Sequence, residues 1–134
     1  RQGEMALLCL DGVVTLNREC LRDVDFLRGL LPQMVRRVGM MPVGEVIIQP
    51  YAHWEGTAPS AVLFMEESSV TVHCYPEADY IEITLHTCAP ISEPGHIVQE
   101  LQAVLGLDMR YHFYAPERNW RERAEAKVLL DQSK

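Results

Sequence analysis

The stretch from residue 69 to residue 88 constrains the fold of this chain more than any other. Residues 69–75 (SVTVHCY) and 80–88 (YIEITLHTC) alternate between apolar and polar side chains, and the Pro-Glu-Ala-Asp segment between them is typical of a turn. Because successive side chains of a strand point to opposite faces, this pattern predicts an antiparallel hairpin whose two faces differ in polarity.

The predicted apolar face carries Val70, Val72, Ile81, Ile83 and Leu85, and the predicted polar face carries Ser69, Thr71, His73, Glu82, Thr84, His86 and Cys88. Helices are expected to cover the apolar face. The polar face has two explanations: exposure to solvent, which is common in antiparallel sheets, or a site that it lines against a second subunit.

The segment before residue 44 predicts one strand and one helix. Residues 5–10 (MALLCL) form a short apolar run that is typical of a buried strand. Apolar side chains then recur at helical spacing between residues 21 and 38, with Asn17 as a candidate cap and Gly39 as the stop. Pro32 lies inside this run and predicts a kink or a break in the helix.

Further elements are predicted on both sides of the hairpin. Residues 44–51 and 60–66 are typical of strands, and a loop is expected between them at residues 52–59. After the hairpin, a second helix is expected from a Ser92 cap to Gly106. A last strand is then expected at 107–114, followed by a charged, partly helical tail at 116–134. The sum is a single α/β domain over residues 1–134, a two-layer α/β sandwich with a mainly antiparallel sheet.

Composition excludes several classes of function. The formal net charge of −7 argues against nucleic-acid binding, which needs a basic patch. No apolar run approaches the roughly 20 residues of a membrane span, and no signal sequence is evident, so we expect a cytoplasmic protein without a membrane partner. The four cysteines show no zinc spacing, which predicts no metal site, and without a signal sequence they are expected to be free thiols.

One motif joins the hairpin to a known family. Residues 65–77 read MEESSVTVHCYPE, and Cys88 follows twenty residues after Ser68. This block resembles the bacterial S-adenosylmethionine decarboxylase proenzyme family, whose members carry Glu-Ser-His, then alternating residues ending in His-x-aromatic-Pro-Glu, and later Thr-Cys-Gly. The family also has a serine eight residues before its processed serine, and Ser60 occupies that position here. The matched block spans residues 44–90.

The resemblance implies that the chain makes its own cofactor, a pyruvoyl group. The Ser68 hydroxyl would attack the carbonyl of Glu67, and β-elimination of the resulting ester would cut the chain between residues 67 and 68. Hydrolysis would leave the pyruvoyl group at the N-terminus of residues 68–134. In this comparison Ser60 would stabilise the oxyanion, and His73 would remove the α-proton of residue 68.

The resemblance also implies roles in turnover. The pyruvoyl carbonyl would form a Schiff base with the substrate's α-amine and accept electrons as CO2 leaves. Cys88 matches the family's proton donor, which prevents a transamination that would inactivate the enzyme, and Glu77 matches an acid that binds the ribose hydroxyls. Family members are homodimers or higher oligomers with shared sites, so we expect two sheets to pair into a four-layer αββα dimer.

The sequence departs from the family in its first strand. Members have Glu-Leu-Trp-Gly or a relative of it there, with an aromatic ring that stacks on adenine, whereas this chain has Cys9-Leu10-Asp11-Gly12. In this register Asp11 replaces the ring. A carboxylate cannot supply the stacking, although it can pair with an ammonium or guanidinium group. Trp54 could provide an adenine platform or pack its own loop.

Three functions therefore remain open at this stage. The main one is a pyruvoyl-dependent S-adenosylmethionine decarboxylase of polyamine biosynthesis. The second is the same fold and cofactor acting on a basic amino acid, as an L-ornithine or L-arginine decarboxylase. The third is an uncleaved regulatory paralogue, against which the intact Ser68, His73 and Cys88 argue. Taken singly, each site residue also has a structural explanation, and for His86 and Cys74 the structural explanation is the one we expect.

Overall fold

The computed structural model describes residues 6–53, 56–66, 68–88 and 94–114 of the chain. Six strands form one sheet, namely β1 (Ala6–Val14), β2 (Pro42–His53), β3 (Gly56–Met65), β4 (Ser68–Tyr75), β5 (Tyr80–Thr87) and β6 (Leu107–Tyr114). The helices are α1 (Val24–Arg37) and α2 (Pro94–Leu105), with short 3-10 turns η1 (Arg18–Arg22) and η2 (Pro76–Ala78). Three predictions, Trp54, Glu67 and the Ser92 cap, lie outside the described residues, as does the tail.

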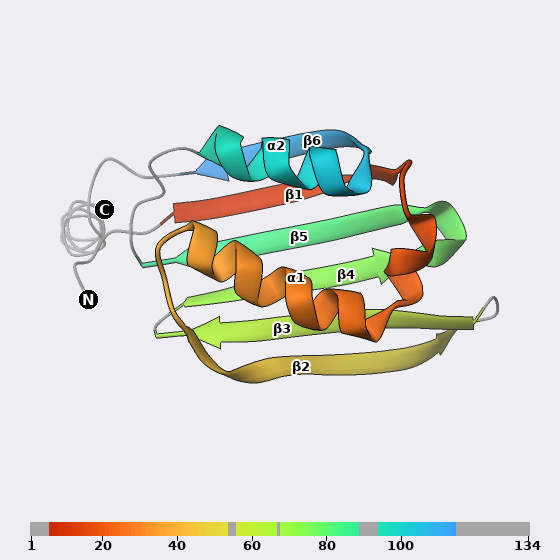
Figure 1. Ribbon diagram of the computed structural model, residues 1–134, viewed down its shortest axis with the longest axis horizontal. Helices are drawn as coiled ribbons and strands as arrows, with labels where there is room; N and C mark the ends of the chain where they lie inside the picture. Colours follow the sequence, from red (N-terminus) through yellow and green to blue (C-terminus); the bar gives the residue numbers. More distant parts are fainter. Residues whose placement is uncertain (1–5, 54–55, 67, 89–93, 115–134) are drawn as a thin grey trace, which may run out of the picture.

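The sheet is antiparallel throughout, in the order β2-β3-β4-β5-β1-β6. Both helices lie on the same face of it (Figure 1). The predicted two-layer α/β sandwich is therefore confirmed. The face turned away from α1 and α2 is called the outer face below.

The core fills the space between the sheet and the two helices. All five residues of the predicted apolar hairpin face are at most 1% exposed. They pack with buried side chains of the helices, among them Leu27, Leu31, Val35, Ile97, Val98, Leu101 and Leu105. Each fully buried aliphatic side chain contributes about 1.5–3 kcal/mol, so this layer is the main source of stability. No helix among the described residues is long and apolar enough to cross a membrane.

The prediction that Asn17 caps the first helix was wrong. Asn17 adopts a left-handed conformation (φ 53) before η1 and makes no side-chain cap bond. The cap of α1 is Asp23, whose carboxylate accepts hydrogen bonds from the backbone N–H groups of Asp25 and Phe26 at 3.0 and 3.2 Å. The intervening 3-10 turn buries Cys20 and Leu21, and this burial, which is not a local property, delays the start of the α-helix.

Pro32 does not break α1, which is continuous from Val24 to Arg37. The ring removes one backbone hydrogen bond, but Leu31 and Val35 on either side are fully buried against the sheet. Tertiary packing therefore offsets the local cost. The predicted stop is confirmed, since Gly39 follows the helix with φ 80.

The predicted loop at residues 52–59 was also wrong, because β2 extends to His53 and β3 begins at Gly56. Pro50 and Pro59 face each other in this ladder. Both are tolerated because β2 is an edge strand and β3 pairs with β4 only from Ser60 onward. The first strand is longer than predicted as well, and ends at Val14.

Candidate active site

A row of polar side chains crosses the outer face of the sheet at one level. The strand register pairs Ser60 with His73, His73 with Glu82, Glu82 with Asp11, and Asp11 with Arg110. These side chains are half-buried or exposed, in contrast with the buried apolar face behind them. The polarity predicted from the hairpin's alternation is confirmed, and the sheet brings the candidate site residues Ser60, His73 and Asp11 into one line.

Ser60 and His73 form the best-defined contact in this row. Ser60 Oγ lies 2.9 Å from His73 Nδ1, across the β3–β4 ladder. When Nδ1 carries the proton, it donates to Ser60 Oγ and leaves the Nε2 lone pair available as a base. Beside the pair is a hollow of about 160 Å³, lined by Ile47, Gln49, Ser60, Ala61, Val62, Thr71 and His73.

Ser68 and Cys88 meet at the other end of β4. The backbone N–H of Cys88, the first residue beyond β5, donates to Ser68 Oγ at 3.0 Å. The Ser68 side chain is 7% exposed, so water has little access to this hydroxyl. The bond fixes the oxygen while leaving its own O–H available to a base.

The structure does not bring the Ser60–His73 pair to Ser68 within one chain. Ser68 and His73 lie five residues apart on β4, and an extended strand rises about 3.3 Å per residue, which separates them by about 16 Å. An odd spacing also turns their side chains to opposite faces. Burial along β4 follows this alternation, since Ser68 is buried with Val70 and Val72, whereas His73 is exposed.

Asp11 is engaged by the chain's own side chains. Its Oδ1 lies 3.5 Å from Arg110 Nε, and this buried oxygen has no hydrogen-bond partner among the described residues. Desolvation raises the pKa of Tyr80, the hydrogen bond to Asp11 and the charges of Asp11 and Glu82 raise it further, and Arg110 opposes them. Sequence reasoning missed Tyr80 and Arg110, because only the β1–β5 and β1–β6 registers bring them to Asp11.

Glu77 occupies η2, directly after β4, and is exposed. It therefore lies nearer in sequence to His73 than to Ser68. Among the described residues no cluster of three or more His, Cys, Asp or Glu side chains could hold a metal ion.

The four cysteines fall into two classes, and none is in a disulfide. Burial raises the pKa of Cys20 to about 11 and that of Cys74 to about 12, and neighbouring charges add to both shifts. Cys9 and Cys88 are half-buried.

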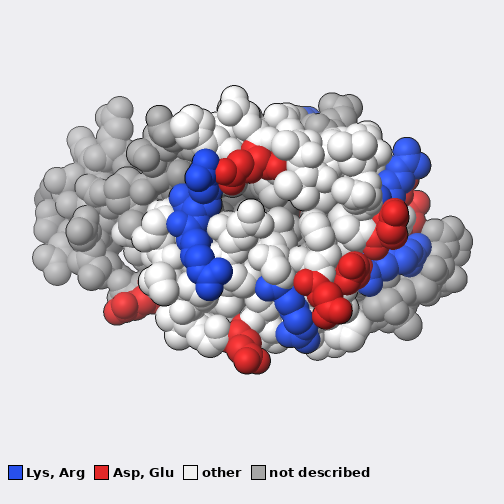
Figure 2. Space-filling view, viewed as in Figure 1, with Lys and Arg blue, Asp and Glu red and all other residues white. Residues whose placement is uncertain are grey.

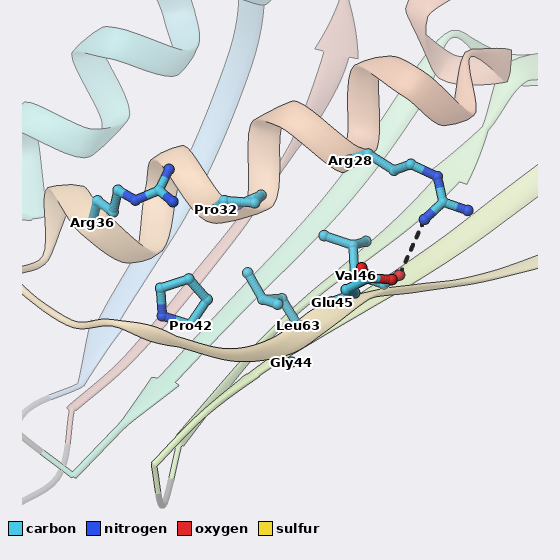
Figure 3. Close-up of a pocket in the computed structure, with 8 residues that line it drawn as sticks. All are labelled: Arg28, Pro32, Arg36, Pro42, Gly44, Glu45, Val46 and Leu63. Atoms are coloured by element: carbon cyan, nitrogen blue, oxygen red, sulfur yellow. Dashed lines mark hydrogen bonds between the residues drawn. The ribbon is translucent and has the colours of Figure 1, made fainter.

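A larger hollow, of about 470 Å³, lies on the helix side between α1 and β2 (Figure 3). Arg28 and Arg36 border it, and the Arg28 guanidinium donates to the carbonyl of Val46 at 3.3 Å. On the same side of the molecule basic side chains lie beside acidic ones (Figure 2), and Arg37 joins α1 to α2 through Glu100 at 2.7 Å. None of the predicted site residues lines this hollow, so hollow size alone does not locate the chemistry.

Comparisons with known proteins agree with the motif. The family model for S-adenosylmethionine decarboxylase matches residues 8–118. The S-adenosylmethionine decarboxylase proenzyme of Oceanobacillus iheyensis is 31% identical over 94 residues, which cover 67% of this chain and 71% of that protein. The proenzyme of Symbiobacterium thermophilum is 31% identical over 88 residues, covering 66% and 64%.

A solved structure extends the comparison to the fold. The adenosylmethionine decarboxylase of Aquifex aeolicus superposes with a TM-score of 0.62 over 87% of this chain and 92% of that one. The sequence identity is 16%, so this likeness concerns the fold.

Proposed function

Because the chain belongs to the S-adenosylmethionine decarboxylase family, as its hairpin motif predicted, we propose that it decarboxylates S-adenosylmethionine with a pyruvoyl group made from Ser68. The observation that carries this proposal is the contact between Ser68 Oγ and the backbone of Cys88. It joins the residue that the family processes to the residue that matches the family's proton donor.

The described residues fit the formation of a pyruvoyl group at position 68. A buried hydroxyl held by one N–H keeps a lone pair for attack on the preceding carbonyl. When the ester formed at Oγ is eliminated, that oxygen leaves as part of a carboxylate, and the same N–H of Cys88 would stabilise its charge. The group, once formed, supplies an electron sink for the loss of CO2.

The roles of Ser60 and His73 require a second copy of the chain. At about 16 Å along β4 they cannot serve the Ser68 of their own chain, whereas a copy packed outer face to outer face could present them to the backbone of residue 68, on the side opposite the buried Oγ. Apolar side chains on that face support such packing, since Val13, Val43, Ile47 and Phe64 are 43–56% exposed. We therefore include in the proposal a homodimer in which His73 of the partner subunit takes the α-proton of residue 68.

The choice of substrate follows from the relatives and from Asp11. The curated relatives described above are S-adenosylmethionine decarboxylase proenzymes. The basic-amino-acid alternative depends on Asp11 as an acceptor for a cationic substrate, but Arg110 of the same chain already forms an ion pair with this carboxylate. Glu77, exposed on η2 at the His73 end, is proposed to bind the ribose hydroxyls of S-adenosylmethionine.

The regulatory alternative is disfavoured by two contacts of the predicted site side chains. Ser60 bonds to His73, and the Ser68 hydroxyl accepts a bond from the backbone N–H of Cys88. A chain that never cleaves itself has no need of either contact.

Denaturing mass spectrometry and CO2 release together test the proposal. We expect fragments 1–67 and 68–134, with a hydrazine-reactive carbonyl at the new N-terminus, and CO2 from S-adenosylmethionine rather than from ornithine or arginine. The Ser68→Ala variant should give one intact, inactive chain, while the matched Ser69→Ala variant should still be cleaved. An intact wild-type chain that releases no CO2 from any of the three substrates would rule out the proposal.

A further inference from the structure

His86 is an imidazole on the outer face at the Ser68 end of the site. The β4–β5 register pairs it with Ser69, the residue next to Ser68. It also precedes Cys88, the first residue beyond β5, by two residues on the same chain. Both side chains are half-buried, in agreement with this placement.

The position of His86 differs from that of His73. His73 lies about 16 Å from Ser68 along β4, whereas His86 lies one cross-strand step from its neighbour Ser69. The sequence alone predicted only a structural role for His86. The register adds that it lies opposite Ser69, beside the residue proposed to become the pyruvoyl group.

We propose that His86 is a positioning residue that returns the proton to the Cys88 thiol after each turnover. This inference rests on the proposed function, and it assigns to His86 the reprotonation of Cys88 between turnovers. In each cycle the S–H bond of Cys88 breaks as a C–H bond forms at the substrate's α-carbon, and the electron pair stays on sulfur. The His86 imidazolium then gives its N–H proton to the thiolate, and the imidazole takes a proton from solvent.

An imidazole suits this task because it can gain and lose a proton near neutral pH. The strands on either side of His86 present few other groups that could exchange a proton with it. Opposite His86, β4 presents Ser69, with Thr71 diagonally placed, and β1 presents Leu7, with Cys9 diagonally placed. Among these neighbours the titratable side chain is that of Cys9, and Cys88 follows His86 in sequence.

A slow return of the proton has a specific consequence. A Cys88 thiolate cannot protonate the substrate carbon in the next cycle, so protonation would be diverted toward the transamination that inactivates the enzyme. His86 variants should therefore complete fewer turnovers before inactivation, although they cleave normally.

The first test measures the reactivity of the Cys88 thiol in a protein that cannot form the pyruvoyl group. In the Ser68→Ala background, the rate of Cys88 alkylation by iodoacetamide is followed by peptide mass spectrometry from pH 5.5 to 9. The resolved peptides separate Cys88 from Cys9, and the raised pKa values of Cys20 and Cys74 keep those two thiols slow. We expect His86→Gln to change the Cys88 profile and the control His96→Gln to leave it unchanged. Identical Cys88 profiles in all three proteins would overturn the inference.

The second test uses the cleaved enzyme. His86→Gln should be processed like the wild type, should lose activity several-fold faster per turnover, and should accumulate alanine in place of the pyruvoyl N-terminus. Added imidazole should slow this loss in His86→Ala. A block in cleavage would overturn the inference by making His86 a processing residue, as would an unchanged number of turnovers. Failure of the wild type to cleave or decarboxylate would instead count against the proposed function.

Discussion

The two ends of β4 hold two different halves of a site. At one end Ser68 is 7% exposed and is held by a backbone N–H of Cys88. At the other end His73 is exposed and is held by the Ser60 side chain. In the proposed function the first half supplies the nucleophile and the second supplies the base. Since both lie on one extended strand, the proposal requires each half to find its counterpart on another chain.

The largest expected effect comes from mixing two inactive chains. Ser68→Ala keeps the His73 half, and His73→Ala keeps the Ser68 half, so neither should be cleaved alone. In co-expressed, differently tagged chains, random pairing in a two-fold dimer gives about half of the His73→Ala chains an intact partner, and these should be cleaved. Mass spectrometry of each tagged chain measures this. If the His73→Ala chain stays intact in the mixture, the two halves act within one chain.

The next largest effect is expected from a change on the outer face, which is the surface proposed to join the two subunits. Phe64 is 50% exposed on the outer face, so Phe64→Asp should leave the fold intact while placing a charge in the proposed interface. We expect dissociation to monomers in analytical ultracentrifugation and loss of cleavage in the same sample.

Val104→Asp is the matched control for this substitution. Val104 is 41% exposed on α2, in the helix layer, and its replacement should affect neither assembly nor cleavage. Cleavage that survives in a monomeric Phe64→Asp protein would contradict shared sites.

A smaller effect on the rate of cleavage is expected from a change at the His73 end of β4. Ser60→Ala removes the hydrogen bond that orients the His73 ring and the donor proposed for the oxyanion. Cleavage should slow by about tenfold to a thousandfold without stopping. A time course of fragment formation measures the rate, and Thr84→Val, another polar residue of the outer face, should leave it near the wild-type value. Equal rates for Ser60→Ala and the wild type would remove Ser60 from the mechanism.

The two ends also show what the sequence could predict. Alternation in residues 69–88 is local, and it gave the hairpin, its buried face and the outward direction of His73. The separation of Ser68 from His73 follows from the same alternation once β4 is known to be straight and extended. The contacts of Asp11 with Arg110 and Tyr80 could not be predicted, because they depend on the pairing of β1 with strands distant in sequence. Asp23 displaced Asn17 as the cap for a similar reason, the burial of η1.

The smallest effect is expected at the Asp11–Arg110 end of the polar row. The Arg110 side chain is 81% exposed, and exposed ion pairs contribute at most about 1 kcal/mol, so Arg110→Ala should barely change the free energy of unfolding at pH 7. Its effect should appear in the titration of Tyr80, followed by tyrosinate absorbance. Arg110 lowers the pKa of Tyr80 and Asp11 raises it, so Arg110→Ala should raise this pKa further and Asp11→Asn should lower it.

The same pKa has a consequence for stability at alkaline pH. A raised pKa in the folded state means that the fold favours the neutral phenol of Tyr80, a contribution present below about pH 10 and lost as pH rises through the folded-state value. Urea unfolding of the Asp11→Asn variant should therefore show a weaker alkaline loss of stability than the wild type. Asp11→Asn should also keep the preference for S-adenosylmethionine, since the carboxylate is engaged within the chain. A switch of substrate preference in this variant would instead show that Asp11 faces the substrate. The decarboxylase of a basic amino acid would then be the better proposal for the function.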